Sequence, residues 1–97
     1  MPPILIFDRA LFGFRRWAKS RLERLGYLTI ETPYTYDDDI VEWACESFDD
    51  FIIITTDKDF PWERKIVLPM QFKTNKGVGK PKYEKWYVFL GFGGFDP

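Results

Sequence analysis

The chain contains no histidine and only one cysteine, Cys45. A disulfide within the chain is therefore excluded. Cys/His zinc sites and nucleophiles activated by histidine are excluded as well. Any metal ion must be held by oxygen ligands, which suit the hard cations Mg²⁺ and Mn²⁺.

The sequence also lacks a long apolar run. No segment approaches the roughly 20 apolar residues that span a bilayer. Residues 1–8 are too short, and become acidic too soon, to resemble a secretory signal. We therefore expect a cytoplasmic protein with no membrane partner, and a single cysteine suits a reducing compartment.

Aromatic residues, by contrast, are abundant: Phe, Tyr and Trp make up 20% of the 97 residues. Bulky side chains help a chain of this size to build a core. We expect a single domain over residues 1–97. Its core should lie in residues 3–70, followed by a basic loop and an aromatic segment in residues 71–97.

Charge is distributed unevenly, although the net charge is only −1. Lys and Arg number six against two Asp and Glu in residues 1–30, one against ten in residues 31–60, and seven against three in residues 61–97. The three segments therefore carry +4, −9 and +4. This pattern suits an enzyme whose carboxylates bind cations and whose basic groups bind a polyanion. The alternative is ordinary solvated surface charge.

Two apolar segments rich in β-branched residues, Ile4–Phe7 and Phe51–Thr55, predict buried strands. The first runs directly into Asp8, and the second is followed by Asp57 and Asp59. Strands that are apolar on both faces are typical of parallel sheets covered by helices. In such sheets ligands bind beyond the carboxyl ends of the strands, where these aspartates lie.

Two stretches between these strands show the apolar spacing of a helix. The first ends at Gly26, and the second begins at Asp37, which we expect to cap it. Residues 27–31 and 66–68 predict further short strands. The apolar positions are Leu11, Phe14, Ala18, Leu22 and Leu25 in the first helix, and Ile40, Val41, Ala44, Cys45 and Phe48 in the second.

The C-terminal part is harder to interpret. Residues 74–82 are rich in Gly, Pro and Lys and predict a loop. Residues 83–95 allow two readings, and the glycines near their end favour a strand or loop over a helix. The strand rests on the alternation of Trp86, Val88 and Leu90, and the helix on the spacing of Tyr83, Trp86, Tyr87 and Leu90.

The order of elements predicts an α/β fold, a small three-layer sandwich with a mainly parallel central sheet. If the first strand is central, its carboxyl end lies beside that of the third strand, where the strand order reverses. Asp8 and Asp57 then face each other, and two close carboxylates repel unless a proton or cation intervenes. A divalent cation held there can activate water for phosphodiester hydrolysis. Residues 37–39 and Asp59 can supply further ligands.

These residues resemble those of PIN-domain ribonucleases, and most closely the short, toxin-type branch. Full-length PIN domains have more helix between the second strand and the Thr-x-Asp motif. The resemblance covers roughly residues 3–70 and implies a PIN-like fold, RNA as substrate and Mg²⁺ or Mn²⁺ as cofactor. It rests on Ile4 to Asp8, Gly26, the acidic helix start at residues 37–40 and Thr55-Thr56-Asp57-Lys58-Asp59-Phe60.

The resemblance also implies which carboxylates form the site. Asp8, Asp57 and Asp59 match the family motif directly, and the helix acid is Asp37 or, second in order, Asp38. The implied metal ligands are Asp8, Asp37, Asp38, Asp57 and Asp59, and the implied catalytic residues are the same set without Asp38.

Basic residues on both sides of the acidic segment are candidates for binding RNA phosphates. Tyr83 and Trp86 are candidates for stacking a base, although they could equally be core aromatics beside a flexible loop. The candidate phosphate-binding residues are Arg9, Arg15, Arg16, Lys19, Lys58, Lys73, Lys76, Lys80 and Lys82.

Each acidic motif also has a purely structural interpretation. Asp8 and residues 37–39 can cap helices, and Asp57 and Asp59 can form a turn. The alternative function is therefore a catalytically inactive PIN-like module, a toxin-antitoxin or regulatory component that binds RNA or an inhibitory protein partner. A homodimer is also consistent with aromatics near the tail. A phospho-accepting role for Asp57 ranks lower, because Asp8 is not part of an acidic pair.

Overall fold

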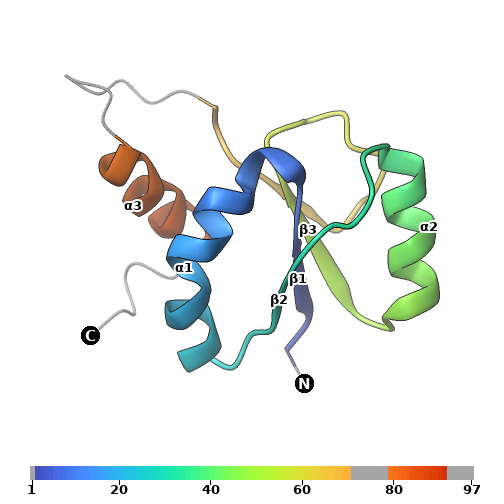
Figure 1. The fold of residues 1–97 in the computed structure, drawn as a ribbon, viewed down its shortest axis with the longest axis horizontal. Coiled ribbons are helices and arrows are strands. Elements are labelled where there is room, and N and C mark those ends of the chain that lie inside the picture. The colour runs from blue at the N-terminus through green and yellow to red at the C-terminus, as the bar shows by residue number, and fades with distance from the viewer. Residues whose placement is uncertain (1, 71–78, 92–97) are drawn as a thin grey trace.

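The computed structural model describes residues 2–70 and 79–91, with the side chains of residues 79–81 left aside. Four strands and three α-helices form this part of the chain, and a short 3-10 helix, η1, precedes the first α-helix (Figure 1). The elements are β1 (Ile4–Phe7), η1 (Arg9–Leu11), α1 (Phe12–Arg24), β2 (Thr29–Glu31), α2 (Asp37–Ser47), β3 (Phe51–Thr55), β4 (Lys65–Val67) and α3 (Gly79–Phe89).

The four strands form one all-parallel sheet in the order β2-β1-β3-β4. The predicted α/β class is confirmed, and β1 lies between β2 and β3, which is the condition under which Asp8 and Asp57 were expected to face each other. Phe7 pairs with Ile54, so β1 and β3 end level with each other. The strand order reverses between them, since β2 lies on one side of β1 and β3 on the other. This edge is the topological switch point, where ligands of parallel α/β sheets bind.

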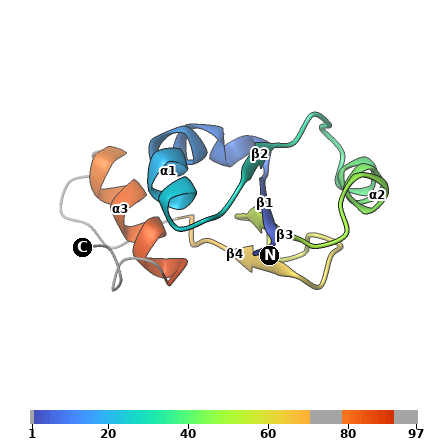
Figure 2. The ribbon, with the colours of Figure 1, turned by 90° about the horizontal axis from the view of Figure 1, so that it is seen from below.

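Helices cover both faces of the sheet, which makes three layers (Figures 1 and 2). Side chains of successive strand residues point to opposite faces. Leu5, Phe7 and Ile54 therefore pack in the cluster shared with α1 and α3, while Ile6 and Ile53 pack in the cluster beneath α2. The crossover from β1 to β2 and the crossover from β2 to β3 run in opposite directions across the sheet, so right-handed connections place α1 and α2 on opposite faces.

Helix α1 has the predicted stripe, with one exception. Leu11, Phe14, Ala18 and Leu22 are buried, but Leu25 is 39% exposed. Leu25 already lies at the C-cap, beyond the last helical turn that faces the sheet. Gly26 ends the helix with a φ of +93°, which glycine adopts at little cost.

Helix α2 begins at Asp37 as expected, but its cap differs from the prediction. Tyr36 is the N-cap residue and provides no side-chain hydrogen bond, so Asp37 already has helical geometry. Asp37 instead lies in the first turn, where a negative charge interacts favourably with the helix dipole. Ile40 and Ala44 are buried, whereas Cys45 is exposed and does not belong to the apolar face.

The C-terminal segment is a helix, so the preference for a strand or loop over residues 83–95 was wrong for the part that the structure describes. The predicted loop likewise gives way to α3 at Gly79. Trp86 and Tyr87 are buried, while Val88 and Phe89 are 61% and 53% exposed. The helical spacing prevails because it lets neighbouring aromatics pack on α1: the Trp86 and Phe14 ring centroids lie 5.4 Å apart.

In residues 2–70 and 79–91, no helix combines the length and apolar character needed to cross a membrane.

Candidate functional site

Asp8 directly follows β1, and both of its carboxylate oxygens are engaged. Its Oδ1 accepts a hydrogen bond from the backbone N–H of Arg9 at 2.7 Å, which caps η1. Its Oδ2 accepts from the hydroxyl of Thr55 at 3.0 Å. The capping interpretation of Asp8 is therefore confirmed, and the same carboxylate also contacts the neighbouring strand.

Thr55 is the last residue of β3 and is fully buried. Besides donating to Asp8, its hydroxyl oxygen accepts a hydrogen bond from the backbone N–H of Asp57 at 3.0 Å. Asp57 in turn accepts from the N–H of Asp59 at 2.9 Å, which confirms the predicted turn. One buried hydroxyl thus links the two segments that carry Asp8 and Asp57.

Asp37 brings a third carboxylate to this edge of the sheet. Its side chain is half-buried, and its pKa is raised above the ordinary value. The main cause is burial, followed by repulsion from Asp8, Asp57 and Asp38 in that order. The carboxylates at the ends of β1 and β3 thus lie close enough to the start of α2 to oppose the ionisation of Asp37.

The chemistry of this group partly fits a divalent cation. Its donors are all carboxylate oxygens, which hard cations prefer, and the mutual repulsion would be relieved by a cation. However, the described residues contain no set of three or more acidic or cysteine side chains arranged to hold a metal ion. Carboxylate oxygens of Asp8 and Asp57 also accept hydrogen bonds from the backbone, in the cap of η1 and in the turn after β3.

A surface hollow of about 480 Å³ lies beside this group. Asp37 and Asp38 reach this hollow from the first turn of α2, and Asp59 reaches it from the segment after β3. Asp38 and Asp59 are exposed. The hollow, hereafter the Tyr36 hollow, is lined by Thr35, Tyr36, Asp37, Asp38, Asp59 and Pro61.

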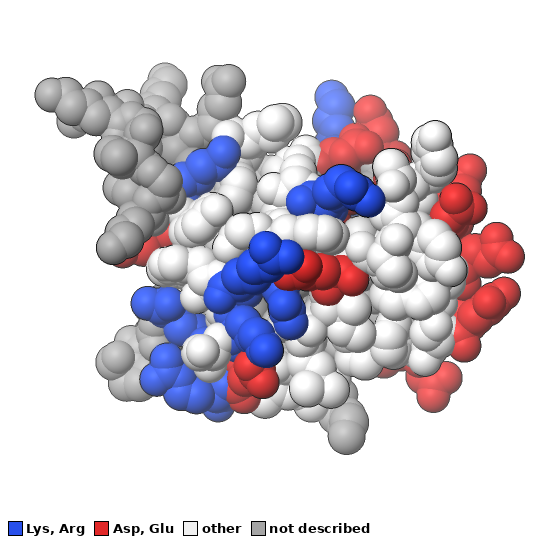
Figure 3. Space-filling view, in the orientation of Figure 1, with Lys and Arg blue, Asp and Glu red and all other residues white. Residues whose placement is uncertain are grey.

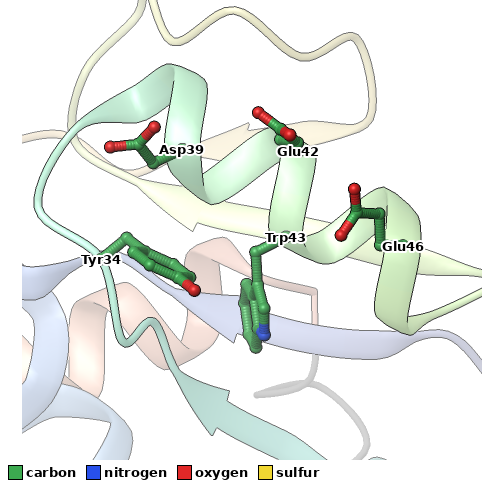
Figure 4. Close-up of a pocket in the computed structure, with 5 residues that line it drawn as sticks. All are labelled: Tyr34, Asp39, Glu42, Trp43 and Glu46. Carbon is green, nitrogen blue, oxygen red and sulfur yellow. The ribbon is translucent and has the colours of Figure 1, made fainter.

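A second hollow lies on the other side of the α2 start, and Asp39 faces it rather than the Tyr36 hollow (Figure 4). Tyr34 and Trp43 lie side by side there, with ring centroids 6.2 Å apart. Asp39, Glu42 and Glu46 follow the same side of the helix. The acidic run at residues 37–39 is thus divided between two hollows.

Two of the predicted phosphate-binding residues are engaged within the fold. Arg15 and Arg16 both bind Glu31, at 3.1 and 2.9 Å. Hydrogen bonding with Arg16 is the main reason why the pKa of Glu31 is lowered. The α1 surface is basic, as Figure 3 shows, but the charges of these two guanidinium groups are partly neutralised by Glu31.

The other predicted basic residues have different environments. Arg9 is exposed near the site, and its guanidinium donates to the hydroxyl of Thr35 at 3.0 Å. Lys58 and Lys19 are exposed, and Lys58 lies between the two turn aspartates. The predictions for Lys73, Lys76 and the side chain of Lys80 lie outside the described residues.

Of the two interpretations of Trp86, the structure supports the core aromatic and not the base-stacking residue. Trp86 is only 4% exposed, and its indole N–H donates to the carbonyl of Pro69. Lys82 covers the ring, with its Nζ 4.6 Å from the ring centroid. Tyr83 packs against Phe14, so both aromatics belong to the core.

Sequence reasoning missed three residues that shape this edge of the sheet. Thr55 was included in the motif, but its hydroxyl was not recognised as the link between Asp8 and Asp57. Glu31 was not recognised as the partner of the α1 arginines. Tyr36, which is 74% exposed, was interpreted only as part of an irregular segment, although an aromatic residue directly before the candidate ligands was a usable signal in the sequence.

Comparisons with protein-family models, with curated proteins and with solved structures found no match to the chain.

Proposed function

We propose that the chain is a metal-dependent endoribonuclease of PIN-like type, which hydrolyses RNA phosphodiester bonds with Mg²⁺ or Mn²⁺. One observation carries the proposal. Asp8, Asp37 and Asp57 come from three separate elements, and they meet closely enough at the switch point of the sheet for Asp8 and Asp57 to raise the pKa of Asp37.

These three carboxylates are the groups that would hold the cation. The bound ion would supply a polarised water and charge stabilisation at the phosphate. Thr55 would keep the Asp8 carboxylate oriented through its hydrogen bond, as groups behind metal ligands generally do. Arg9 and Lys58 are exposed beside the aspartates and would attract the RNA phosphates.

The proposal is tested by cleavage of labelled single-stranded RNA with Mn²⁺ or Mg²⁺, and with EDTA. Asp57→Asn keeps the shape of the side chain and removes its charge. We expect cleavage by the native chain, none in EDTA, and a loss of about 100-fold or more in the variant, because several kcal/mol of charge stabilisation disappear.

Asp49→Asn is the matched control. Asp49 is also an exposed aspartate next to β3 but precedes the strand, at the opposite edge of the sheet. The Asp49→Asn variant should therefore cleave RNA like the native chain. Equal activity of the native and Asp57→Asn proteins, purified identically, would indicate a contaminating nuclease and contradict the proposal.

The second candidate is a PIN-like module that binds RNA or a protein without cleaving it. It is favoured by the hydrogen bonds that already engage Asp8 and Asp57 and by the absence, in the described part of the chain, of a preformed cluster of three ligands. Absence of cleavage, together with absence of Mn²⁺ binding to the native chain, would support this module over the nuclease.

A further inference from the structure

Tyr36 is an aromatic residue whose side chain the fold uses little. It is 74% exposed, the highest value among the exposed large hydrophobic residues in the part of the chain that the structure describes. It caps α2 through its backbone carbonyl, which accepts from the N–H of Ile40 at 3.0 Å, and provides no side-chain cap. An exposed ring with no part in the cap is available to a ligand.

The position of Tyr36 relates this ring to the candidate cation site. Tyr36 and Asp37 are adjacent in sequence and line the same hollow of about 480 Å³. Pro61, from the segment after β3, contributes another apolar surface to it. A flat group that rests on Tyr36 would thus lie next to the carboxylates of Asp37 and Asp59.

A positive charge is also fixed at the rim. Arg9 donates to the hydroxyl of Thr35, another residue of the Tyr36 hollow, at 3.0 Å. A guanidinium held at this place can pair with a phosphate. Aromatic surface with a nearby cation is the combination that binds single-stranded nucleic acid, because bases stack and phosphates pair with the basic group.

We propose that Tyr36 is the stacking platform for one unpaired base of a single-stranded RNA, held beside the Asp8, Asp37 and Asp57 group. This inference rests on the proposed function and adds to it a residue that would contact a base of the substrate. A base-paired helix does not present the free face of a base, so the platform selects unstacked, single-stranded RNA.

The acidic lining of the hollow adds a preference among bases. Ionised Asp38 and Asp59 only accept hydrogen bonds. Cytosine presents an amino group at the position where uracil presents a carbonyl oxygen. A carboxylate can accept from the former and repels the latter, so cytosine should be preferred over uracil.

The test measures the dissociation constants of fluorescently labelled oligo(C) and oligo(U) RNA by anisotropy. Ca²⁺ replaces Mn²⁺, because it is also bound by oxygen ligands. The native chain should bind oligo(C) several-fold more tightly than oligo(U). Tyr36→Ala should weaken oligo(C) binding about tenfold, as loss of a stacked base generally does, whereas Tyr36→Phe should bind like the native chain.

Tyr34→Ala is the matched control. Tyr34 is also an exposed tyrosine of the segment before α2, but it lines the second hollow with Trp43. Tyr34→Ala should leave the affinity for oligo(C) unchanged. Equal affinities of the native and Tyr36→Ala chains, equal weakening by Tyr34→Ala, or no binding of either RNA would overturn the stacking proposal. Equal affinities for oligo(C) and oligo(U) would overturn the base preference.

The two proposals fail in different ways. Binding that depends on Tyr36, without cleavage when Mn²⁺ replaces Ca²⁺, contradicts the nuclease and supports the stacking platform. Metal-dependent cleavage with unchanged KM in Tyr36→Ala supports the nuclease and contradicts the platform. If both hold, Tyr36→Ala should raise KM with little change in kcat, because stacking is equal in the ground and transition states.

Discussion

The buried hydroxyl of Thr55 donates to Asp8 Oδ2 at 3.0 Å and joins the carboxyl ends of the two central strands. The same oxygen accepts the N–H of Asp57 at 3.0 Å. Thr55 therefore positions both the side chain of Asp8 and the backbone of Asp57. Such a group controls the spacing between two aspartates without itself facing the solvent.

The first prediction concerns this hydroxyl. Thr55→Val keeps the shape but removes both hydrogen bonds, and should lower the free energy of unfolding by about 1–3 kcal/mol. RNA cleavage should fall at least about tenfold, because Asp8 loses its orienting donor. Urea denaturation and initial rates measure the two effects.

Thr55→Ser separates the hydroxyl from the methyl group. It should cost about 1 kcal/mol of stability through the lost apolar burial, yet keep the activity. If the valine and serine variants lose activity equally, the hydroxyl does not position the site.

The second prediction follows from the raised pKa of Asp37. At neutral pH the ionised carboxylate is opposed in the folded state by burial and by Asp8 and Asp57. Asp37→Asn should therefore increase the free energy of unfolding at pH 7. As the pH falls through the raised pKa, the folded native chain takes up the proton before the unfolded chain does and the penalty disappears.

The gain from Asp37→Asn should accordingly shrink towards zero at about pH 3, below the ordinary pKa of an aspartate. Denaturation at both pH values, without divalent cations, checks this. Asp39→Asn, which faces the second hollow, should show no such gain. A gain for Asp37→Asn that does not change with pH would contradict the electrostatic explanation.

The third prediction concerns divalent cations. Mn²⁺ that binds the folded state should raise the thermal midpoint, by an amount equivalent to about 2.7 kcal/mol at 100 times the dissociation constant. EDTA should reverse the effect. Asp57→Asn should lose most of it and Asp49→Asn should keep it, which differential scanning fluorimetry can record. Equal shifts in all three proteins would place cation binding elsewhere.

The fourth prediction concerns the neutralised arginines of α1. Glu31 has a lowered pKa, chiefly because of its hydrogen bond with Arg16. Its stabilising contribution is therefore present above the ordinary pKa of a glutamate and is lost as the pH falls through the lowered value. Glu31→Gln should reduce the thermal midpoint slightly at pH 7, and this difference should vanish once the pH is below the lowered pKa.

The same substitution releases the charges of Arg15 and Arg16. If the α1 surface contacts RNA, Glu31→Gln should tighten RNA binding and steepen its dependence on salt. Glu23 is an exposed glutamate on α1, the helix that carries Arg15 and Arg16. Glu23→Gln is therefore the control for the loss of one negative charge. Equal salt dependence of the two variants would remove Arg15 and Arg16 from the RNA-binding surface.

The fifth prediction concerns the contact between α1 and α3. A Cβ at Gly13 would lie 2.5 Å from the Tyr83 hydroxyl oxygen, and the Tyr83 ring packs against Phe14 and Trp17. Alanine ordinarily favours a helix over glycine by about 1 kcal/mol. Here Gly13→Ala should instead lower stability by about 1 kcal/mol, because overpacking outweighs that gain.

In a Tyr83→Phe background, where the hydroxyl is absent, Gly13→Ala should become neutral or stabilising. A double-mutant cycle by urea denaturation measures this coupling. Additive effects would show that α3 does not restrict Gly13.

The sequence was most informative where the evidence is local. Four short apolar segments were recognised as strands because β-branched runs and flanking turns are properties of neighbouring residues. A parallel β-α-β unit followed from the right-handed crossover rule. The juxtaposition of Asp8 and Asp57 was expected only on the condition that β1 is central, and the strand order of the structure meets this condition.

Errors arose where distant residues decide the outcome. The alternation of Trp86 and Val88 suggested a strand, but packing of Trp86 on Phe14 selects the helix. Likewise, the pairing of Arg16 with Glu31 depends on how α1 lies beside β2. A single sequence contains the residues of such contacts but not the information that they meet.

The two faces of the sheet carry unequal cores, and this inequality affects the site. Helices α1 and α3 share the larger cluster, whereas α2 rests on the smaller one with Ile40 and Ala44. Elements that bury less apolar surface open more readily. Backbone amides of α2 should thus exchange with deuterium earlier than those of β1 and β3. Asp37 therefore lies on the helix with the smaller core. Local opening of α2 would separate Asp37 from Asp8 and Asp57 while the rest of the protein stays folded.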